Sequence, residues 1–330
     1  MQCERHVRAV EAGVRTEGHG CHRSDSRPGV TTKHAKFATR SVVDGVLVID
    51  KPQGLTSHDV VAVARRALAE RRIGHTGTLD PLATGVLPLA CGRATRLVRF
   101  LTASDKEYEA TIRFGLTTDS YDITGTETSQ SGLTPDRNAV MAAMAELTGN
   151  YLQLPPAFSA KKIAGRRAYE LARQDQEVAL RPVPITVASA VLDDLAGDAA
   201  RVRLTCSAGF YVRSFAHSLG EKVGTGACLE ALRRTRSGDF TLDHAITLEQ
   251  LIPGAQSVVG GVIPLDRLLP SLPTVTVTDE GRSRVSHGQE VEGTAGAAEW
   301  VRLTDSQGCL LAMAKTGSRQ GFLHPAVVLI

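Results

Sequence analysis

One segment constrains the fold more than any other: residues 71–92, RRIGHTGTLDPLATGVLPLACG, whose glycines and prolines exclude a continuous helix. Pro81 restricts the residue before it to extended backbone, so we expect Asp80 in a loop with its carboxylate directed into a cleft or into water. Glycines without a Cβ would let a large partner approach this loop, and the neighbouring threonines offer hydroxyl donors. Composition alone favours an ordinary turn that starts at Asp80.

The composition is that of an ordinary globular protein, with 42% hydrophobic and 22% charged residues. No apolar run reaches the roughly 18 residues that cross a bilayer, and the first residues lack the apolar core of a secretory signal. We therefore expect a cytoplasmic protein with no membrane partner. The six cysteines have no CxxC spacing, which favours reduced thiols.

The net charge of +3 comes mostly from residues 1–43, which hold eight Lys or Arg against four Asp or Glu. This stretch has few apolar positions and no sustained period, so we expect a flexible basic tail. Its cysteines and histidines match no zinc spacing, and we expect no metal. Elsewhere the basic residues form short clusters, such as Arg233, Arg234 and Arg236, which on their own indicate a solvated helix face.

Hydrophobic periodicity predicts strands and helices in alternation after the tail. Thr56 and Asp59 have the spacing of a capping box, and residues 106–114 alternate so that Tyr108 faces the core. Thr134 is the expected cap of a helix that Gly149 ends. In full, we expect strands at 45–50, 86–92, 106–114, 185–192 and 201–206, and helices at 56–70, 95–101, 135–148 and 212–223.

After Pro270 the composition changes to short alternating strands separated by glycine-rich turns. We expect these strands at 274–277, 299–303 and 309–314, which predicts a small β-rich module. Upstream, a predicted strand runs directly into a predicted helix at GFYVRS, so Tyr211 and Arg213 lie at a junction. Such junctions often carry the residues of a functional site.

The segment GHTGTLDPLATGVLPLACGRATRL closely resembles the catalytic motif of bacterial tRNA pseudouridine-55 synthases, the TruB class. Four other segments agree in order with the same family. They are GVLVIDKPQGLTSHDVV at 45–61, KEYEATIRFGLTTDSYDITG at 106–125, QLPPAFSAKKIAGRRAYELAR at 153–173 and CSAGFYVRSFAHSLG at 206–220. Five blocks in one order are far more specific than one short motif.

The resemblance implies an α+β fold in which a mixed, largely antiparallel sheet is flanked by helices. It implies a catalytic pseudouridine synthase domain over 44–271 and a small β-rich, PUA-like RNA-binding domain over 272–330. The implied reaction converts uridine 55 in the T-arm loop of tRNA to pseudouridine by base flipping, with the T-arm stem-loop as partner and without a cofactor. We expect a monomer.

The family motif also implies site residues. Asp80 would be the catalytic carboxylate, either attacking C1′ or abstracting a ribose proton, and Arg213 would keep it ionised. Tyr108 would lie against the target base, Leu232 would pack on the uracil ring, and His75 would enter the RNA loop. Further substrate contacts are expected from Lys51, Tyr211, Lys161 and Lys162.

Two other functions fit parts of the sequence. A glycoside hydrolase would use Asp80 as nucleophile with Asp119 or Asp122 as acid, which requires those carboxylates to face each other across one cleft. An RNA chaperone would bind and remodel tRNA without chemistry. Replacing Asp80 by Asn separates the enzyme from the chaperone.

Overall fold

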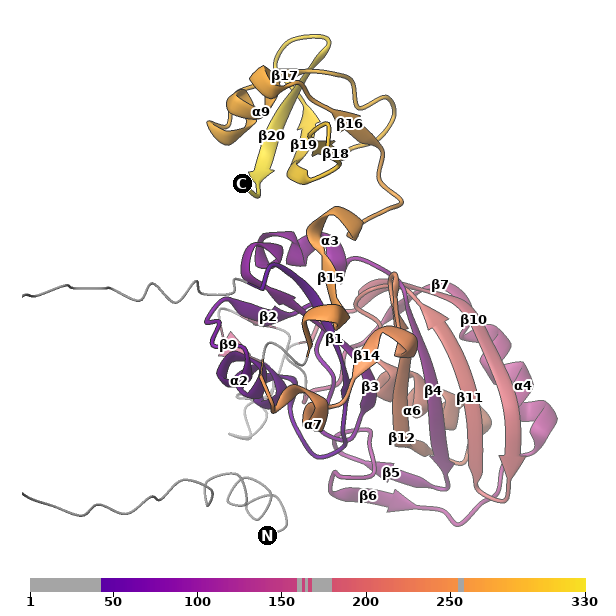
Figure 1. Cartoon of the computed structure of the whole chain (residues 1–330). Helices are drawn as coiled ribbons and strands as arrows, with labels where there is room; N and C mark the ends of the chain where they lie inside the picture. The colour runs from indigo at the N-terminus through magenta and orange to yellow at the C-terminus, as the bar shows by residue number, and fades with distance from the viewer. Residues whose placement is uncertain (1–42, 159–161, 164–165, 168–179, 255–257) are drawn as a thin grey trace, which may run out of the picture. The chain divides into compact units, whose positions relative to one another are not determined.

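Figure 1 shows the computed structural model, which describes residues 43–158, 162–163, 166–167, 180–254 and 258–330. The predicted tail lies outside the described residues except for Val43. Within the described ranges, the helices are too short or too polar to traverse a lipid bilayer.

A mixed sheet of eleven strands forms the centre of the described chain, in the order β14-β1-β3-β12-β4-β11-β10-β7, with β2, β13 and β15 pairing at its sides. The β1–β14 and β12–β3 pairs are parallel and the other pairs are antiparallel, which confirms the predicted mixed, largely antiparallel sheet. The strands are β1 (Gly45–Lys51), β2 (Ile73–His75), β3 (Thr84–Cys91), β4 (Lys106–Phe114), β7 (Gly149–Gln153), β10 (Val183–Ala196), β11 (Ala199–Cys206), β12 (Ala227–Ser237), β13 (Phe240–Thr241), β14 (Ala245–Ile246) and β15 (Val262–Pro264).

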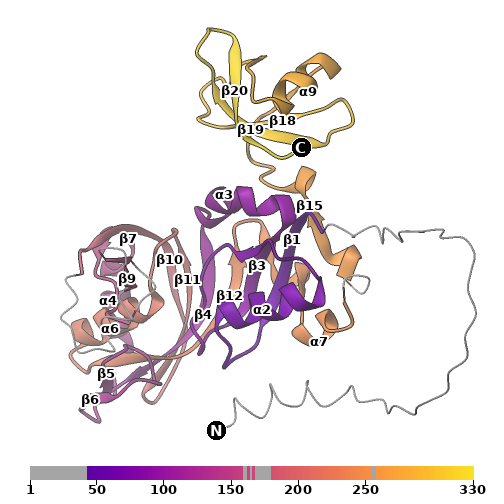
Figure 2. The same cartoon turned by 90° about the vertical axis from the view of Figure 1, so that its left-hand side faces the viewer.

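Helices pack on this sheet and short elements connect it. Figure 2 shows α4 and α6 together on one side of β4, β11 and β10. The helices are α2 (Ser57–Ala67), α3 (Val98–Thr102), α4 (Arg137–Glu146), α6 (Val212–Val223) and α7 (Leu248–Leu251), with the 3-10 turns η1 (Gly92–Leu97), η2 (Leu242–His244), η3 (Val259–Gly261) and η4 (Leu265–Arg267). Two small hairpins complete this part, β5 (Leu116–Thr118) with β6 (Glu127–Gln130), and β8 (Lys162–Ile163) with β9 (Arg166–Arg167).

Strand β4 separates a buried face of the sheet from a charged one. Tyr108, Ala110, Ile112 and Phe114 are buried, as the alternation predicted, while the residues between them are at least partly exposed. The outward face carries ion pairs between neighbouring strands, including Arg236 with Glu107 and Arg113 with Glu230. This alternation of buried apolar and exposed polar residues is typical of an antiparallel sheet with one solvated face.

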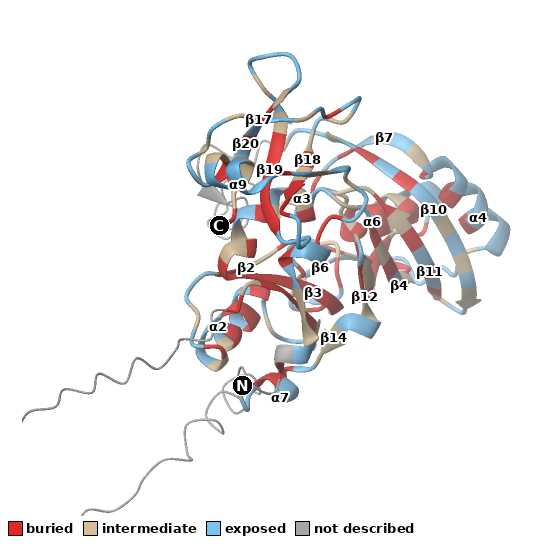
Figure 3. Cartoon of the chain, turned by 45° about the horizontal axis from the view of Figure 1, so that its top comes forward, coloured by how far each residue is buried: buried red, intermediate tan, exposed pale blue. Residues whose placement is uncertain are grey.

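Strand β3, which follows the Asp80 loop, is buried along nearly its whole length (Figure 3). Leu87 and Leu89 belong to the core beneath α2 and α6, whereas Val86 and Ala90 pack into a second cluster on the other face. Burial on both faces makes β3 a rigid support for the loop that precedes it.

Several predicted helix boundaries were wrong. The capping box of Thr56 and Asp59 is present, but α2 ends at Ala67 rather than Glu70. Helix α4 is capped by Asp136, whose carboxylate accepts from two backbone amides, and not by Thr134, because Asp caps at least as well and stands next to the first turn. Met141 of α4 is 53% exposed.

The C-terminal residues form a separate small sheet in the order β16-β18-β19-β20-β17, which confirms the predicted β-rich module. Its strands are β16 (Thr274–Thr276), β17 (Val291–Glu292), β18 (Val301–Thr304), β19 (Leu310–Thr316) and β20 (Phe322–Val328). Helix α9 (Asp279–Ser286), capped by Thr278, was not predicted. It contributes Val285 to a core that contains Leu303 and Leu323.

Candidate active site

Asp80 lies in the loop between β2 and β3, and its backbone is fixed from both sides. The Ser57 hydroxyl accepts from the Leu79 amide at 2.8 Å and donates to the Leu79 carbonyl at 3.0 Å. The Gly54 amide donates to the Pro81 carbonyl at 2.8 Å. The Asp80 side chain is 40% exposed, so a rigidly held carboxylate faces solvent.

Arg213, at the start of α6, is the partner of this carboxylate. Its Nε lies 2.9 Å from Oδ2 of Asp80, although the Arg213 side chain is only 6% exposed. The remaining nitrogens donate to backbone carbonyls, Nη1 to Ser120 at 3.0 Å and Nη2 to Phe158 at 2.9 Å. The guanidinium is thus oriented by several groups and presents a fixed positive charge to the Asp80 carboxylate.

A glutamine that the sequence analysis did not identify holds the junction between β11 and α6. Gln153 of β7 accepts from the Tyr211 amide at 2.8 Å and donates to the Tyr211 carbonyl at 3.0 Å. Ser214 donates to the Leu154 carbonyl at 2.8 Å. These contacts fix the first turn of α6 and hence the position of Arg213.

Asp122, between β5 and β6, is a second acidic partner of Arg213. Its Oδ2 lies 3.7 Å from Nη1 of Arg213, and its side chain is 8% exposed. Its Oδ1 accepts from the Ser120 hydroxyl at 3.0 Å and from the Thr124 amide at 3.0 Å. The sequence proposed Asp122 only as a hydrolase acid, although it stands in one of the segments that carry the family resemblance.

This arrangement does not provide the paired carboxylates of a glycoside hydrolase. Asp119 is exposed and accepts from the Thr126 amide within its own loop. Asp122 is bound to the guanidinium that also holds Asp80, through a different nitrogen. Asp119 thus accepts a hydrogen bond from within its own loop, and Asp122 and Asp80 share one guanidinium.

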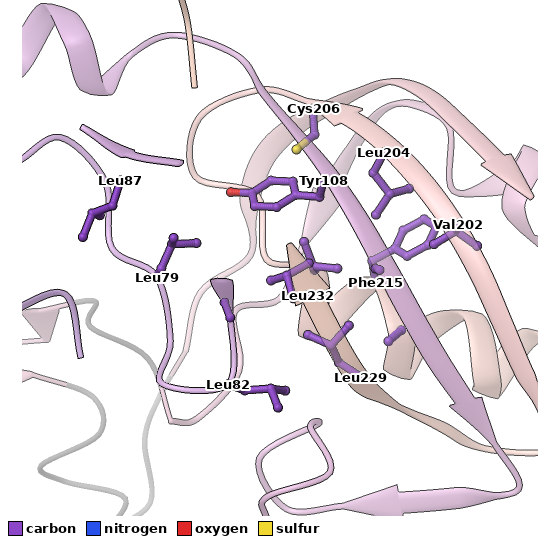
Figure 4. Packing of buried hydrophobic residues seen from close by; sticks show 14 of the residues in the cluster. Leu79, Leu82, Leu87, Tyr108, Val202, Leu204, Cys206, Phe215, Leu229 and Leu232 are labelled. Atoms are coloured by element: carbon purple, nitrogen blue, oxygen red, sulfur yellow. The ribbon is translucent and has the colours of Figure 1, made fainter. Parts of the chain in front are cut away.

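Tyr108 and Leu232 lie in the apolar cluster beside the loop. Figure 4 shows the Tyr108 hydroxyl pointing away from Cys206, toward the side on which Leu79 lies. Tyr108 is 8% exposed and Leu232 9%. Burial raises the pKa of Tyr108, and the positive charge of Arg234 opposes that shift.

Lys51, at the end of β1, holds the Asp80 loop through hydrogen bonds to its backbone. Its side chain is fully buried, and its ammonium donates to the carbonyls of Ala83 at 2.6 Å, Pro52 at 2.9 Å and Pro81 at 3.5 Å. Burial lowers the pKa of Lys51 to about 8, and the negative charge of Asp80 partly opposes this shift. A direct substrate contact, which the resemblance implied, does not fit an amine without exposed surface.

His75 ends β2 at the edge of the loop, partly exposed, with its ring edge-on to His58 at 5.3 Å. Lys162 belongs to β8, but its side chain and the whole of Lys161 lie outside the described residues. Four exposed arginines lie in the second half of α2 and just before β2: Arg65, Arg66, Arg71 and Arg72.

A hollow of about 490 Å³ adjoins the loop but does not contain the reactive pair. Leu82, Ala110 and Leu232 contribute to its lining, together with charged residues of the outward sheet face such as Arg201 and Glu109. Asp80, Tyr108 and Arg213 do not line it. The geometry of the Asp80 and Arg213 pair, rather than this hollow, therefore defines the candidate site.

The fold defines the class of protein. Two solved structures align with 88% of this chain and 86% of their own chains. One is a Cbf5-Nop10-Gar1 complex, with a TM-score of 0.69 and 27% identity. The other is an H/ACA RNP bound to a substrate RNA containing 2′-deoxyuridine, with a TM-score of 0.68 and 25% identity. The fold is therefore that of the pseudouridine synthases.

Sequence comparisons narrow this class. Residues 65–212 match the TruB family pseudouridylate synthase N-terminal domain, and residues 213–269 match the tRNA pseudouridylate synthase B C-terminal domain. The chain is 43% identical to tRNA pseudouridine synthase B of Solibacter usitatus over 87% of this chain and all of the relative, and 42% identical to that of Aromatoleum aromaticum over 80% and 86%. The chain belongs to the TruB family of tRNA pseudouridine synthases, which are isomerases.

Proposed function

We propose that this chain isomerises uridine 55 in the T-arm loop of tRNA to pseudouridine, with Asp80 as the reactive carboxylate. The observation that carries the proposal is the contact between Asp80 and Arg213, which places a solvent-facing carboxylate on a rigid loop beside a fixed positive charge. In the reaction the N1–C1′ bond breaks with its electron pair passing to the uracil. The base then turns, C5 bonds to C1′, the C5 proton is released to solvent, and N1 takes up a proton. No net oxidation occurs, so the reaction needs no redox cofactor.

The carboxylate has two possible uses, attack on C1′ or abstraction of a ribose proton. Both need an ionised Asp80 that reaches the sugar, which its 40% exposed side chain supports. Arg213 supplies the opposite charge, and Asp122 shares and orients the guanidinium. The proposal therefore assigns Asp80 the chemistry and Arg213 its electrostatic support.

A uridine stacked in an RNA loop must leave the stack before its sugar reaches Asp80, at a cost of a few kcal/mol. We assign His75 the place left by the base, because it stands at the exposed rim of the loop. Tyr108 and Leu232 would receive the flipped base on their apolar surface. Tyr211 would border the base at the start of α6.

Phosphate contacts would come from basic residues around this rim. We assign Lys161 and Lys162 to phosphates, as the family resemblance implies, and add the exposed arginines at 65, 66, 71 and 72. We also propose that residues 44–271 are the catalytic domain and that the β-rich residues 272–330 are a PUA-like RNA-binding domain. We expect the protein to act as a monomer in the cytoplasm.

A tritium-release assay tests the proposal. A T-arm hairpin labelled at C5 of uracil is incubated with the purified protein without added cofactor, beside a matched hairpin that carries cytidine at position 55 and labelled uridines elsewhere. We expect release from the first hairpin and none from the second. Equal release from both would refute the position, and no release from the first hairpin would refute the activity.

A further inference from the structure

Arg234 of β12 is among the largest fully buried side chains of the described residues, with 1% exposure. The sequence placed it in a solvated basic cluster with Arg233 and Arg236. In the sheet, Arg233 and Arg236 point to the outward face and pair with acids, whereas Arg234 points inward. Alternation puts Arg233 and Arg234 on opposite faces, and the β-bulge between Arg234 and Arg236 shifts the register so that Arg236 lies on the outward face with Arg233.

The guanidinium of Arg234 joins both ends of the Asp80 loop. Nε donates to the Val86 carbonyl at 2.7 Å, just after the loop, and Nη2 donates to the Gly77 carbonyl at 3.2 Å, just before Asp80. Arg234 also stands directly opposite Tyr108 in the β12–β4 register, and its positive charge acts on the Tyr108 hydroxyl. One side chain thus contacts the loop and neighbours Tyr108.

Arg234 makes these contacts without an acidic partner: no carboxylate of the residues that the structure describes forms an ion pair with it. Lys51 and Lys106 are buried nearby, and both likewise donate to backbone carbonyls. Burying a cation without a counter-ion opposes folding, so such a group is weak evidence for a stabilising role. It does create a positive potential around Asp80 and Tyr108.

We propose that Arg234 is a positioning residue for the reaction: it fixes Tyr108 relative to the Asp80 loop and supplies positive charge where the detached uracil gains an electron pair. This inference rests on the proposed function, because a base that leaves with its bonding electrons is the species that the charge would stabilise. Neither the carbonyls of the loop nor the Tyr108 hydroxyl offers a positive charge of its own.

The test compares Arg234→Met and Arg234→Lys with the matched control Arg236→Met, which changes the outward face of the same strand. For each variant we would measure the single-turnover rate of pseudouridine formation in the T-arm hairpin, the Kd for that hairpin and the thermal midpoint. We expect Arg234→Met to lower the rate about 100-fold, and Arg234→Lys, which keeps the charge, about tenfold. Kd should change by less than about threefold and the midpoint by less than about 5 °C, because the removed buried charge offsets the lost hydrogen bonds.

Three results would overturn the proposed role of Arg234. A rate for Arg234→Met within about threefold of wild type would overturn the inference, as would equal losses in the Lys and Met variants, which would remove the role of charge. A midpoint lowered by more than about 10 °C in both variants would assign Arg234 to folding and overturn it too. If wild type and Arg236→Met are both inactive, the proposed function itself has failed.

Discussion

Arg213 and Asp80 meet at 2.9 Å, one side chain almost fully buried and the other open to solvent. The buried partner is held by the Ser120 and Phe158 carbonyls, so it offers a fixed charge to a carboxylate that a substrate can reach. Preorganised charge of this kind acts without reorganisation during the reaction. The pair is therefore the feature on which the following predictions depend.

Replacing Arg213 by Lys keeps the charge but loses the planar fork that contacts Asp80, Asp122 and two carbonyls. We expect the single-turnover rate to fall about 100-fold with little change in RNA affinity. Arg201→Lys, which alters an exposed ion pair on the outward sheet face, is the control and should keep the wild-type rate. Equal rates for both variants would contradict the role of Arg213.

Asp122→Asn removes the second negative charge beside Arg213 while keeping the size of the side chain. The guanidinium would lose part of its orientation, and we expect the rate to fall about tenfold. Asp119→Asn changes the exposed acid of the same loop and should leave the rate nearly unchanged. If the two substitutions lower the rate equally, loop structure rather than the contact with Arg213 explains the loss.

Lys51 predicts a pH dependence of stability. Below pH 8 its amine is protonated in the folded and the unfolded chain, whereas between pH 8 and the ordinary lysine pKa of 10.5 only the unfolded chain keeps the proton. The unfolded state then binds more protons, so this group makes the free energy of unfolding rise with pH. In urea unfolding from pH 7 to pH 10, wild type should gain stability relative to Lys51→Met. A constant difference between the two would contradict the lowered pKa.

The backbone conformation of Gly85, near the start of β3, requires a glycine. Its φ is +96°, and a Cβ added there would lie 2.2 Å from the Arg234 carbonyl oxygen. We expect Gly85→Ala to lower the free energy of unfolding by about 3 kcal/mol or more, from backbone strain and the clash together. At Gly74 a Cβ would meet nothing within 4 Å, so Gly74→Ala should be nearly neutral. Thermal or urea unfolding of both variants measures the contrast.

The sequence predicts those parts of the fold whose signals are local. The alternation over 106–114 and the capping box at Thr56 depend on neighbouring residues alone, and both are present in the structure. The predicted N-cap of α4 was wrong because Thr134 and Asp136 are both suitable caps, and only the packing of the helix selects between them. Strand β2 is three residues long and leaves too short a pattern to recognise.

The site was predictable only as far as the family motif reaches. Asp80 and Arg213 lie in two matched segments, and the fold brings them together. The inward direction of Arg234 depends on its place in β12, which the sequence did not identify as a strand. The family resemblance implied a substrate contact for Lys51, whereas here three backbone carbonyls accept hydrogen bonds from its ammonium group in the core.

The central claim is that the carboxylate of Asp80 performs the chemistry. The most direct measurement is tritium release from the C5-labelled T-arm hairpin by Asp80→Asn, at enzyme concentrations above the Kd measured for the same variant. We expect hairpin binding within about threefold of wild type and no detectable release, since the amide can neither attack C1′ nor accept a ribose proton. Release at the wild-type rate would contradict the account and leave a protein that acts by binding alone or through another residue.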